Sequence, residues 1–382
     1  MHLTMFFTLL VLTTCAAVCG HSDSKLTQCS ASMSAVPGEI KTQSLMQAAV
    51  SKKPNVTMVG FLTWESRKVE ESNVVLPQMR TPPSCTVSPL TNACLPSFMV
   101  IGTQKCATSS LYNIISTHPQ VEPAYKKELL WFNGNFEKLR CNPPDSKPDD
   151  EEFEEYLTKF PRLPSNTTAL TGEFSATYMH CWCCPRAMQR LMPDLRLITQ
   201  LRDPIERARS RWNEQHSWAK KITTYSSFEE YVERKLPHLE ACLEKAGNSL
   251  EDKTHCAAKS NILGLSVYDS VIKLWQQHFQ PNNFLVTYLE QLAKDPQSVV
   301  SSIHRHLGIA DLQYPGDLLH KKYNAEGHYG WQRSLQNLQI GNSTALEKLY
   351  MFYRPHMQEL KAMADAGHIT PLPKSWRVRW NL

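Results

Sequence analysis

The chain has 382 residues, of which 42% are apolar and 20% are charged. A chain of this size and composition can bury a large core, so it needs neither a repeat architecture nor a structural metal in order to fold. The formal net charge of +5 is small and its basic residues are dispersed, so we expect no nucleic acid as a partner.

Residues 1–20 contain an uncharged apolar run from Met5 to Val18, followed by small residues. This order is typical of a secretory signal peptide. Because the run is shorter than the ~20 residues that a membrane span requires, we expect cleavage near Gly20. The alternative is a signal anchor, in which residues 1–20 stay in the membrane. In both cases the rest of the chain enters the secretory pathway and is placed in the Golgi lumen or secreted.

Three sequons and abundant cysteine agree with a lumenal address. Asn55, Asn166 and Asn342 each begin an Asn-x-Ser/Thr triplet, the acceptor for N-glycosylation. In an oxidising compartment the cysteines predict disulfides, and we expect Cys242 and Cys256 to pair across a short loop that contains a glycine. The stretch "CWCC" lacks the two-residue spacer of a zinc site, so we expect no metal.

Residues 21–94 are rich in Ser, Thr and Pro without a sustained hydrophobic period, which predicts an irregular stem. From residue 95 to 382, apolar runs alternate with amphipathic segments. The predicted strands are Phe98–Ile101, Leu170–Phe174, Leu195–Leu201 and Phe284–Tyr288. The predicted helices are Ser109–Ser116, Ile205–His216, Leu265–Phe279 and Pro296–Leu307. This alternation predicts an α/β domain with a parallel sheet covered by helices, in which ligands bind where strands end and helices begin.

The first such junction, in "FMVIGTQKCATSSLYNII", has the composition of an anion site. Gly102 permits a tight turn after the first strand, and Thr108 and Ser109 stand where a helix begins. The N-terminus of a helix favours an anion, and Lys105 adds a full positive charge. The segment is not a Walker A loop, because no glycine immediately precedes the lysine. The alternative is an ordinary turn with an exposed Lys105.

The second junction, in "LITQLRDPIERARSRW", marks the start of a helix. Asp203 suits the N-cap, Pro204 suits the first helical position, and Glu206 completes a capping box. Arg202 stands just before the cap, and Ser210 lies seven residues after Asp203 on the same side of the helix. Arg202 and Ser210 are suited to a second anion. The alternative is a solvated arginine and a packed serine.

These two segments resemble the 5′-phosphosulfate loop and the 3′-phosphate motif of sulfotransferases that use 3′-phosphoadenosine 5′-phosphosulfate (PAPS). The segment "KKELLWFNGN" is similar to the one that carries a catalytic glutamate in Golgi carbohydrate sulfotransferases. Later segments look like the branch that contains N-acetylgalactosamine 4-sulfate 6-O-sulfotransferase. The resemblance covers about Leu95 to Trp376 and implies a P-loop-like parallel β-sheet flanked by helices, the sulfotransferase fold.

The resemblance implies a role for each matching residue. Lys105 would contact the transferred sulfuryl group, and Glu128 would be the general base. The other donor contacts would come from Gly102, Thr108, Ser109, Arg202 and Ser210, with Lys321 and Lys322 on a loop that closes over the nucleotide. His180 and Trp182 are candidates for acceptor contact or for the core. No metal is required, because a sulfuryl group carries less charge than a phosphoryl group and a lysine can replace the metal ions.

Two residues depart from the family pattern. Ala107 stands where glycine is usual, at a cost on the order of 1 kcal/mol if the backbone needs a positive φ. Phe174 stands where heparan-sulfate enzymes usually have lysine, which disfavours a heparan acceptor. The expected activity is transfer of a sulfuryl group from PAPS to a carbohydrate hydroxyl on a glycosaminoglycan-like glycan. An inactive secreted glycan-binding protein with the same fold, and a sulfotransferase for a non-carbohydrate acceptor, are the alternatives.

Overall fold

The computed structural model describes residues 86–88, 94–133, 150–164, 167–218, 222–321, 323 and 343–382. All of them belong to one compact unit, Lys52–Leu382. Several predicted features lie outside the described residues, namely the signal or anchor segment, most of the stem, Lys322, and the sequon residues Asn55, Asn166 and Asn342. Among the described helices, none combines the length and the apolar character that crossing a membrane requires.

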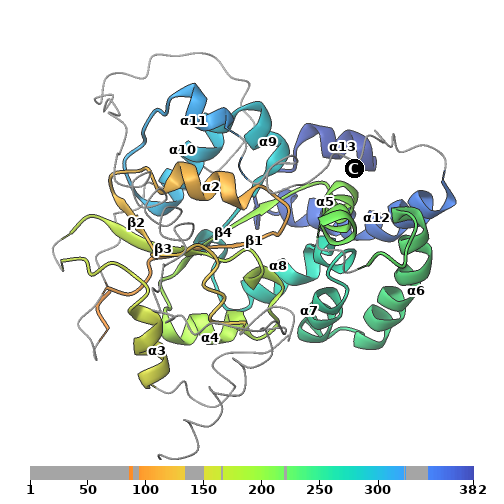
Figure 1. Ribbon diagram of the computed structural model, residues 1–382, viewed down its shortest axis with the longest axis horizontal. Coiled ribbons are helices and arrows are strands. Elements are labelled where there is room, and N and C mark those ends of the chain that lie inside the picture. Colours follow the sequence, from red (N-terminus) through yellow and green to blue (C-terminus); the bar gives the residue numbers. More distant parts are fainter. Residues whose placement is uncertain are drawn as a thin grey trace, which may run out of the picture. The chain divides into compact units, whose positions relative to one another are not determined.

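Within the described residues, the core of this unit is a parallel sheet of five strands in the order β2-β3-β1-β4-β5 (Figure 1). The strands are β1 (Phe98–Gly102), β2 (Val121–Pro123), β3 (Leu170–Phe174), β4 (Arg196–Leu201) and β5 (Phe284–Tyr288). All except β2 were predicted to within one residue at each end. β2 has only three residues, including a proline, which is too short to show a period of two. The predicted α/β fold is confirmed.

β1 lies at the centre of the sheet. Its Phe98 is level with Gly172 of β3 and with Arg196 of β4, and both pairings are parallel. The C-terminal ends of these three strands therefore meet at one edge of the sheet. The segments that follow β1, β3 and β4 begin side by side at this edge, which is where a parallel sheet binds its ligands.

Both faces of the sheet are buried. Along β1, Met99 and Ile101 pack into the larger hydrophobic cluster, whereas Phe98 and Val100 pack into a second cluster. Successive side chains of a strand point to opposite faces, so the two clusters lie on the two faces of the sheet. This double burial explains why β1 consists of an uninterrupted apolar run rather than an alternating one.

Helices cover the two faces (Figure 1). On the face of Phe98, α2 (Thr108–Ile115) and α10 (Pro296–Leu307) contribute Leu111, Ile303 and other apolar side chains. On the face of Met99, α4 (Cys184–Leu191), α8 (Asp269–Gln276) and α12 (Thr344–Asp365) contribute to the larger cluster. The other α-helices of the described residues are α3 (Asp150–Leu157), α5 (Pro204–Asn213), α6 (Phe228–Ala246), α7 (Leu250–Lys259), α9 (Leu289–Lys294), α11 (Gly316–His320) and α13 (Lys374–Trp380).

Some predicted helices differ in extent from the observed ones. The helix predicted over Leu265–Phe279 was wrong at its start, because a 3-10 turn, η4 (Gly264–Ser266), and an extended Val267 precede α8. The helix predicted over Ile205–His216 is α5 followed by a π-helical turn, η3 (Glu214–Trp218).

The helices α6 and α7 were not predicted. They carry Cys242 and Cys256, which form a disulfide with their Cα atoms 5.7 Å apart. The bond ties the end of α6 to α7, and the two helices also pack against each other. The expected cysteine pair is thus present in the structure.

Candidate active site

The two predicted anion junctions meet at the C-terminal edge of the sheet. Lys105 follows β1, Arg202 follows β4, and these strands are hydrogen-bonded neighbours. The guanidinium Nη1 of Arg202 lies 3.4 Å from the backbone carbonyl oxygen of Lys105. Residues almost a hundred positions apart in the sequence therefore border one site.

The loop between β1 and α2 is held by the neighbouring strand. The N–H of Thr103 donates to the carbonyl of Gln200 at 2.9 Å, and the side-chain amide of Gln200 donates to the carbonyl of Cys106. The Thr103 hydroxyl lies 2.8 Å from the sulfur of Met179. These contacts fix the backbone around Lys105 before any ligand binds.

The loop ends in a left-handed turn that begins α2. Ala107 is the N-cap residue and has φ 61°, so the positive φ considered for this position is present without glycine. The strain is on the order of 1 kcal/mol. Alanine provides no capping side chain, and α2 has no side-chain cap. The first turn of α2, with Thr108 and Ser109, is therefore suited to an anionic ligand that completes the cap.

Gly102 is required by close packing rather than by its backbone angles. A Cβ atom added there would lie 2.7 Å from Cβ of Met179 and 3.4 Å from the carbonyl oxygen of Ala176. Real Cβ atoms do not approach so closely, so a side chain would push apart the segments that follow β1 and β3. Gly102 thereby allows these two segments to approach each other.

We expect Gly102→Ala to lower the free energy of unfolding by about 1–3 kcal/mol, because it overpacks the contact with Met179. Chemical denaturation followed by circular dichroism measures the change. Gly316→Ala is the matched control, since a Cβ atom at Gly316 meets nothing within 4 Å. Equal stability of the two variants would contradict this account of Gly102.

Lys105 is largely buried and pairs with an acidic residue. Its Nζ lies 3.4 Å from Oε1 of Glu214, and the Lys105 side chain is 13% exposed. Burial lowers the pKa of Lys105 to about 8, and the charge of Glu214 partly offsets this effect. Lys105 is thus a cation at neutral pH with a low exposed fraction, which strengthens its attraction for an anion.

Glu214 was missed by the sequence analysis. It begins η3 directly after α5 and also accepts a hydrogen bond from Nη1 of Arg211 at 2.5 Å. A sequence signal existed, because Glu214 follows Asp203 by eleven residues, or about three helical turns. It therefore extends the helix face on which Ser210 was placed.

At the start of α5, one of the two interactions of the predicted capping box is present. The carboxylate of Asp203 accepts hydrogen bonds from the N–H groups of Ile205 and Glu206, both at 3.1 Å. The prediction that the Glu206 side chain accepts from the N–H of Asp203 was wrong. That N–H donates instead to Oε1 of Glu290 at 2.9 Å. Glu206 instead lies within 3.9 Å of Arg202. Glu206 also pairs with Arg209 and Arg379, at 3.8 and 3.5 Å.

The remaining predicted donor contacts are less closely connected. Ser210 lies on α5, half-buried, seven residues after Asp203. Lys321 follows α11 and is exposed, with its ammonium 5.2 Å from the ring centroid of Tyr323. The contacts of Lys321 do not tie it to Lys105 or Arg202, so its role in donor binding stays a prediction.

Glu128 lies beside the end of β3. Its N–H donates to the carbonyl of Phe174 at 2.9 Å, and its Oε2 accepts from the N–H of Ala176 at 3.0 Å. Its Oε1 pairs with Nζ of Lys127, and the Glu128 side chain is 33% exposed. The water-poor surroundings expected for Glu128 are therefore present only in part. Because the carbonyl of Ala176 also borders Gly102, Glu128 belongs to the same edge as Lys105.

The segment after β3 contains the two candidate acceptor residues. His180 is 1% exposed, and neither ring nitrogen has a hydrogen-bond partner in the described residues. Burial, with the nearby Arg207 as a smaller cause, lowers the pKa of His180 to about 3, so the ring is neutral. This placement favours the core alternative for His180. Trp182 is half-buried, with its ring 6.1 Å from the ring of His255, and stays a candidate for acceptor contact.

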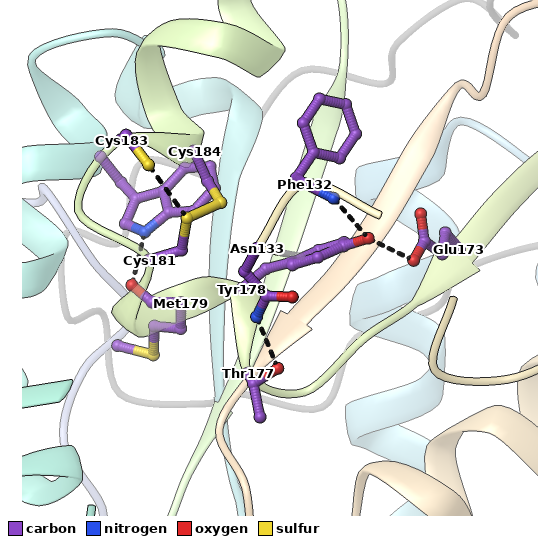
Figure 2. The surroundings of a disulfide bond; sticks show 10 residues. Phe132, Asn133, Glu173, Thr177, Tyr178, Met179, Cys181, Cys183 and Cys184 are labelled. Carbon is purple, nitrogen blue, oxygen red and sulfur yellow. Dashed lines mark hydrogen bonds between the residues drawn. A yellow bond between two sulfur atoms is a disulfide. The ribbon is translucent and has the colours of Figure 1, made fainter. Parts of the chain in front are cut away.

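The cysteines of "CWCC" form disulfide bonds, one of which is shown in Figure 2. Cys181 is bonded to Cys184, and the sulfur of Cys183 lies 3.7 Å from that of Cys181. Cys94 and Cys183 each take part in a further disulfide. Over the described ranges, no group of three or more His, Cys, Asp or Glu residues is arranged to hold a metal ion.

Comparison with known proteins defines the class. The model of the Sulfotransferase domain family matches residues 95–321, which is more than half of the chain. The chain therefore belongs to the sulfotransferase family. Among solved structures, the sulfotransferase from Alicyclobacillus acidocaldarius superposes with a TM-score of 0.51 at 20% identity, covering 75% of this chain and 100% of that chain. This similarity supports the same fold.

Curated relatives provide a more specific similarity. The chain is 28% identical over 310 residues to bifunctional heparan sulfate N-deacetylase/N-sulfotransferase 3 of Homo sapiens, covering 74% of this chain and 31% of that protein. It is 26% identical over 223 residues to bifunctional heparan sulfate N-deacetylase/N-sulfotransferase 1 of Xenopus laevis, covering 56% of this chain and 22% of that protein. The chain thus spans less than a third of the length of these relatives.

Proposed function

We propose that the protein transfers a sulfuryl group from PAPS to a hydroxyl of a glycosaminoglycan-like glycan. The observation that carries this proposal is the meeting of Lys105 and Arg202 at one sheet edge, inside a segment that matches the Sulfotransferase domain. Two cationic groups at this edge suit a nucleotide that carries phosphate groups at both the 3′ and the 5′ position of its ribose. The proposed address is the secretory pathway, in the Golgi lumen or outside the cell.

The donor would bind across the two junctions. Lys105 and the first turn of α2, with Gly102, Thr108 and Ser109, would hold the 5′-phosphosulfate. Arg202 and Ser210 would hold the 3′-phosphate, and Lys321 and Lys322 would close over the nucleotide. The start of α2, which has no side-chain cap, and the low exposure of Lys105 support this assignment.

The reaction would be an in-line displacement at sulfur. The acceptor oxygen forms a bond to sulfur while the bond from sulfur to the bridging phosphate oxygen breaks, and Glu128 takes the hydroxyl proton. The departing nucleotide keeps the electron pair of the broken bond, and Lys105 stabilises the negative charge that develops there. This scheme requires no metal ion.

The acceptor class is proposed from the relatives and from Phe174. The curated relatives are named for heparan sulfate, which supports an anionic glycan as the acceptor class. Phe174 occupies the position at which heparan-sulfate enzymes usually carry lysine, so a related glycan other than heparan is favoured. The resemblance of later segments to the branch that contains N-acetylgalactosamine 4-sulfate 6-O-sulfotransferase agrees with this choice, and membership of that branch stays a prediction.

Radiolabelled PAPS, offered with a panel of desulfated and sulfated glycosaminoglycans, tests the proposal. We expect label in at least one galactosamine-containing glycan. Calorimetry with adenosine 3′,5′-bisphosphate distinguishes the alternatives. Nucleotide binding without transfer to any glycan would redirect the search to non-carbohydrate acceptors such as protein tyrosine. Absence of nucleotide binding would favour a glycan-binding protein that has lost the activity.

A further inference from the structure

A buried carboxylate lies directly behind the segment that carries Glu128. Glu173 belongs to β3 and is 0% exposed. Hydroxyl groups donate to it from three residues: Ser175 Oγ at 2.5 Å and Tyr178 Oη at 2.8 Å, both to Oε1, and Tyr156 Oη at 2.6 Å to Oε2. A buried carboxylate is costly unless such donors compensate it. The sequence analysis gave Glu173 no role.

Two of these hydroxyls connect Glu173 to the loop that follows Glu128. Ser175 Oγ accepts from the N–H of Leu130 at 3.2 Å, and Tyr178 Oη accepts from the N–H of Phe132 at 3.4 Å. Figure 2 shows the second connection, in which the Tyr178 hydroxyl lies between Glu173 and the N–H of Phe132. The third hydroxyl, on Tyr156, is bonded to Glu173 and has no bond to this loop among the described contacts.

The direction of these bonds depends on the carboxylate. A hydroxyl has one proton to donate, so it can accept from a backbone N–H while it donates elsewhere. Burial raises the pKa of Glu173, and the hydrogen bonds from its three hydroxyl donors oppose that rise. Oε1 accepts from Ser175 and Tyr178 when the carboxyl group is ionised and also when its proton is on Oε2, so in both forms it orients these hydroxyls with their lone pairs toward the loop. An amide at this position could keep its oxygen toward Ser175 and Tyr178 and its NH₂ group toward Tyr156, so only a variant without side-chain oxygens removes the acceptor of both hydroxyls.

The loop has a backbone that needs such support. Glu128 has φ 62° and Leu130 has φ 57°, and neither residue is glycine. Left-handed backbone costs an L-residue about 1–2 kcal/mol, so it persists only where the surroundings impose it. The hydrogen bonds to Leu130 and Phe132, together with those that join Glu128 to Phe174 and Ala176, support it here. The rings of Trp131 and Phe132 also pack against the ring of Tyr156, which Tyr156→Phe keeps.

We propose that Glu173 is a positioning residue, whose carboxylate acts through the hydroxyls of Ser175 and Tyr178 to hold the 128–132 backbone and thereby the carboxylate of Glu128. The inference rests on the proposed function and deepens it, because it identifies the residues that orient Glu128, the proposed base. Glu173 itself does not touch the donor in this scheme. On the donor side of the edge, Lys105 pairs with Glu214 and Arg202 with Glu206, and neither carboxylate belongs to this network.

Three single variants test the inference: Ser175→Ala, Tyr178→Phe and Tyr156→Phe. The first two remove a hydroxyl that reaches the loop. Tyr156→Phe removes a hydroxyl that reaches only Glu173, so it is the matched control. We expect Ser175→Ala and Tyr178→Phe to lower kcat about 10–100-fold, as a base displaced by a fraction of an ångström would. Affinity for adenosine 3′,5′-bisphosphate should stay within about twofold, and Tyr156→Phe should keep near-normal kcat.

Hydrogen exchange provides a readout that needs no activity. The amides of Leu130 and Phe132 should lose protection in the Ser175→Ala and Tyr178→Phe variants respectively, and both should lose it in Glu173→Ala, which removes the oxygen that accepts from both hydroxyls, while the amides of β1 keep theirs. Unchanged protection at Leu130 and Phe132, or an equal loss of kcat in all three hydroxyl variants, would overturn the inference. If the wild-type protein transfers no sulfuryl group, the proposed function fails, and the exchange result alone decides whether Glu173 positions the loop.

Discussion

Lys105→Ala should lose binding of the sulfuryl donor and transfer sulfate about 10²–10³-fold more slowly than the wild-type protein, as expected for removal of a preorganised charge at the reacting centre. The reason is the position of Lys105, which follows β1 and whose nearly buried Nζ lies 3.4 Å from Oε1 of Glu214. Calorimetry with adenosine 3′,5′-bisphosphate measures the loss of binding. Because burial lowers the pKa of Lys105 to about 8, the wild-type affinity should also weaken as the pH rises through 8, where the ammonium loses its proton.

Arg202→Ala separates the two ends of the nucleotide. We expect this variant also to lose donor binding, through the 3′-phosphate, so that it binds adenosine 3′,5′-bisphosphate no more tightly than adenosine 5′-monophosphate. Lys105→Ala should weaken binding of both nucleotides. Because it keeps Arg202, its remaining binding should still be tighter for adenosine 3′,5′-bisphosphate than for adenosine 5′-monophosphate. Lys348→Ala, at an exposed lysine of α12, is the matched control and should bind both nucleotides normally. Wild-type affinity in either site variant would refute the assignment of these residues.

Glu128→Gln should lower the rate of transfer about 10²–10⁴-fold, which is the usual contribution of a general base. The amide cannot take a proton, although its oxygen can still accept from the N–H of Ala176. Nucleotide affinity should therefore stay within about twofold, and the loss should appear in kcat. Single-turnover transfer from radiolabelled PAPS measures it directly.

The control for Glu128→Gln is Glu240→Gln, an exposed glutamate on α6 that is expected to have normal activity. If Glu128→Gln retained the full rate, the base would lie elsewhere. Glu214 would then be the carboxylate to test, since it lies 3.4 Å from Nζ of Lys105.

The local parts of this site could be predicted from the sequence. Gly102 after an apolar run, and Asp203 followed by Pro204, mark where strands end and helices begin through short-range sterics and capping. These signals act within a few residues, so the ends of strands and the starts of helices can be predicted without the tertiary structure. They placed Lys105 and Arg202 at strand ends, and the parallel order of β1 and β4 then brought them to one edge.

Other features depend on contacts between segments far apart in the sequence. The bond from Asp203 to Glu290 replaced the expected capping box because β5 and α9 bring that carboxylate to the start of α5. The burial of His180 likewise follows from packing after β3, since a histidine beside a tryptophan and cysteines reads equally well as surface or core. No local pattern distinguishes these outcomes.

The sequence by itself determined four of the five strands described, the two turns proposed to bind anions and the family resemblance, because apolar periodicity, caps and motif spacing are properties of neighbouring residues. Only the tertiary structure decided that Glu214 pairs with Lys105 and that Glu173 is buried beneath the loop of Glu128. The physical reason is that the surroundings of a charged side chain are set by the segments that pack against it in the folded chain. For Glu173 those neighbours come from α3 and from the segment after β3, which meet only when the sheet has formed.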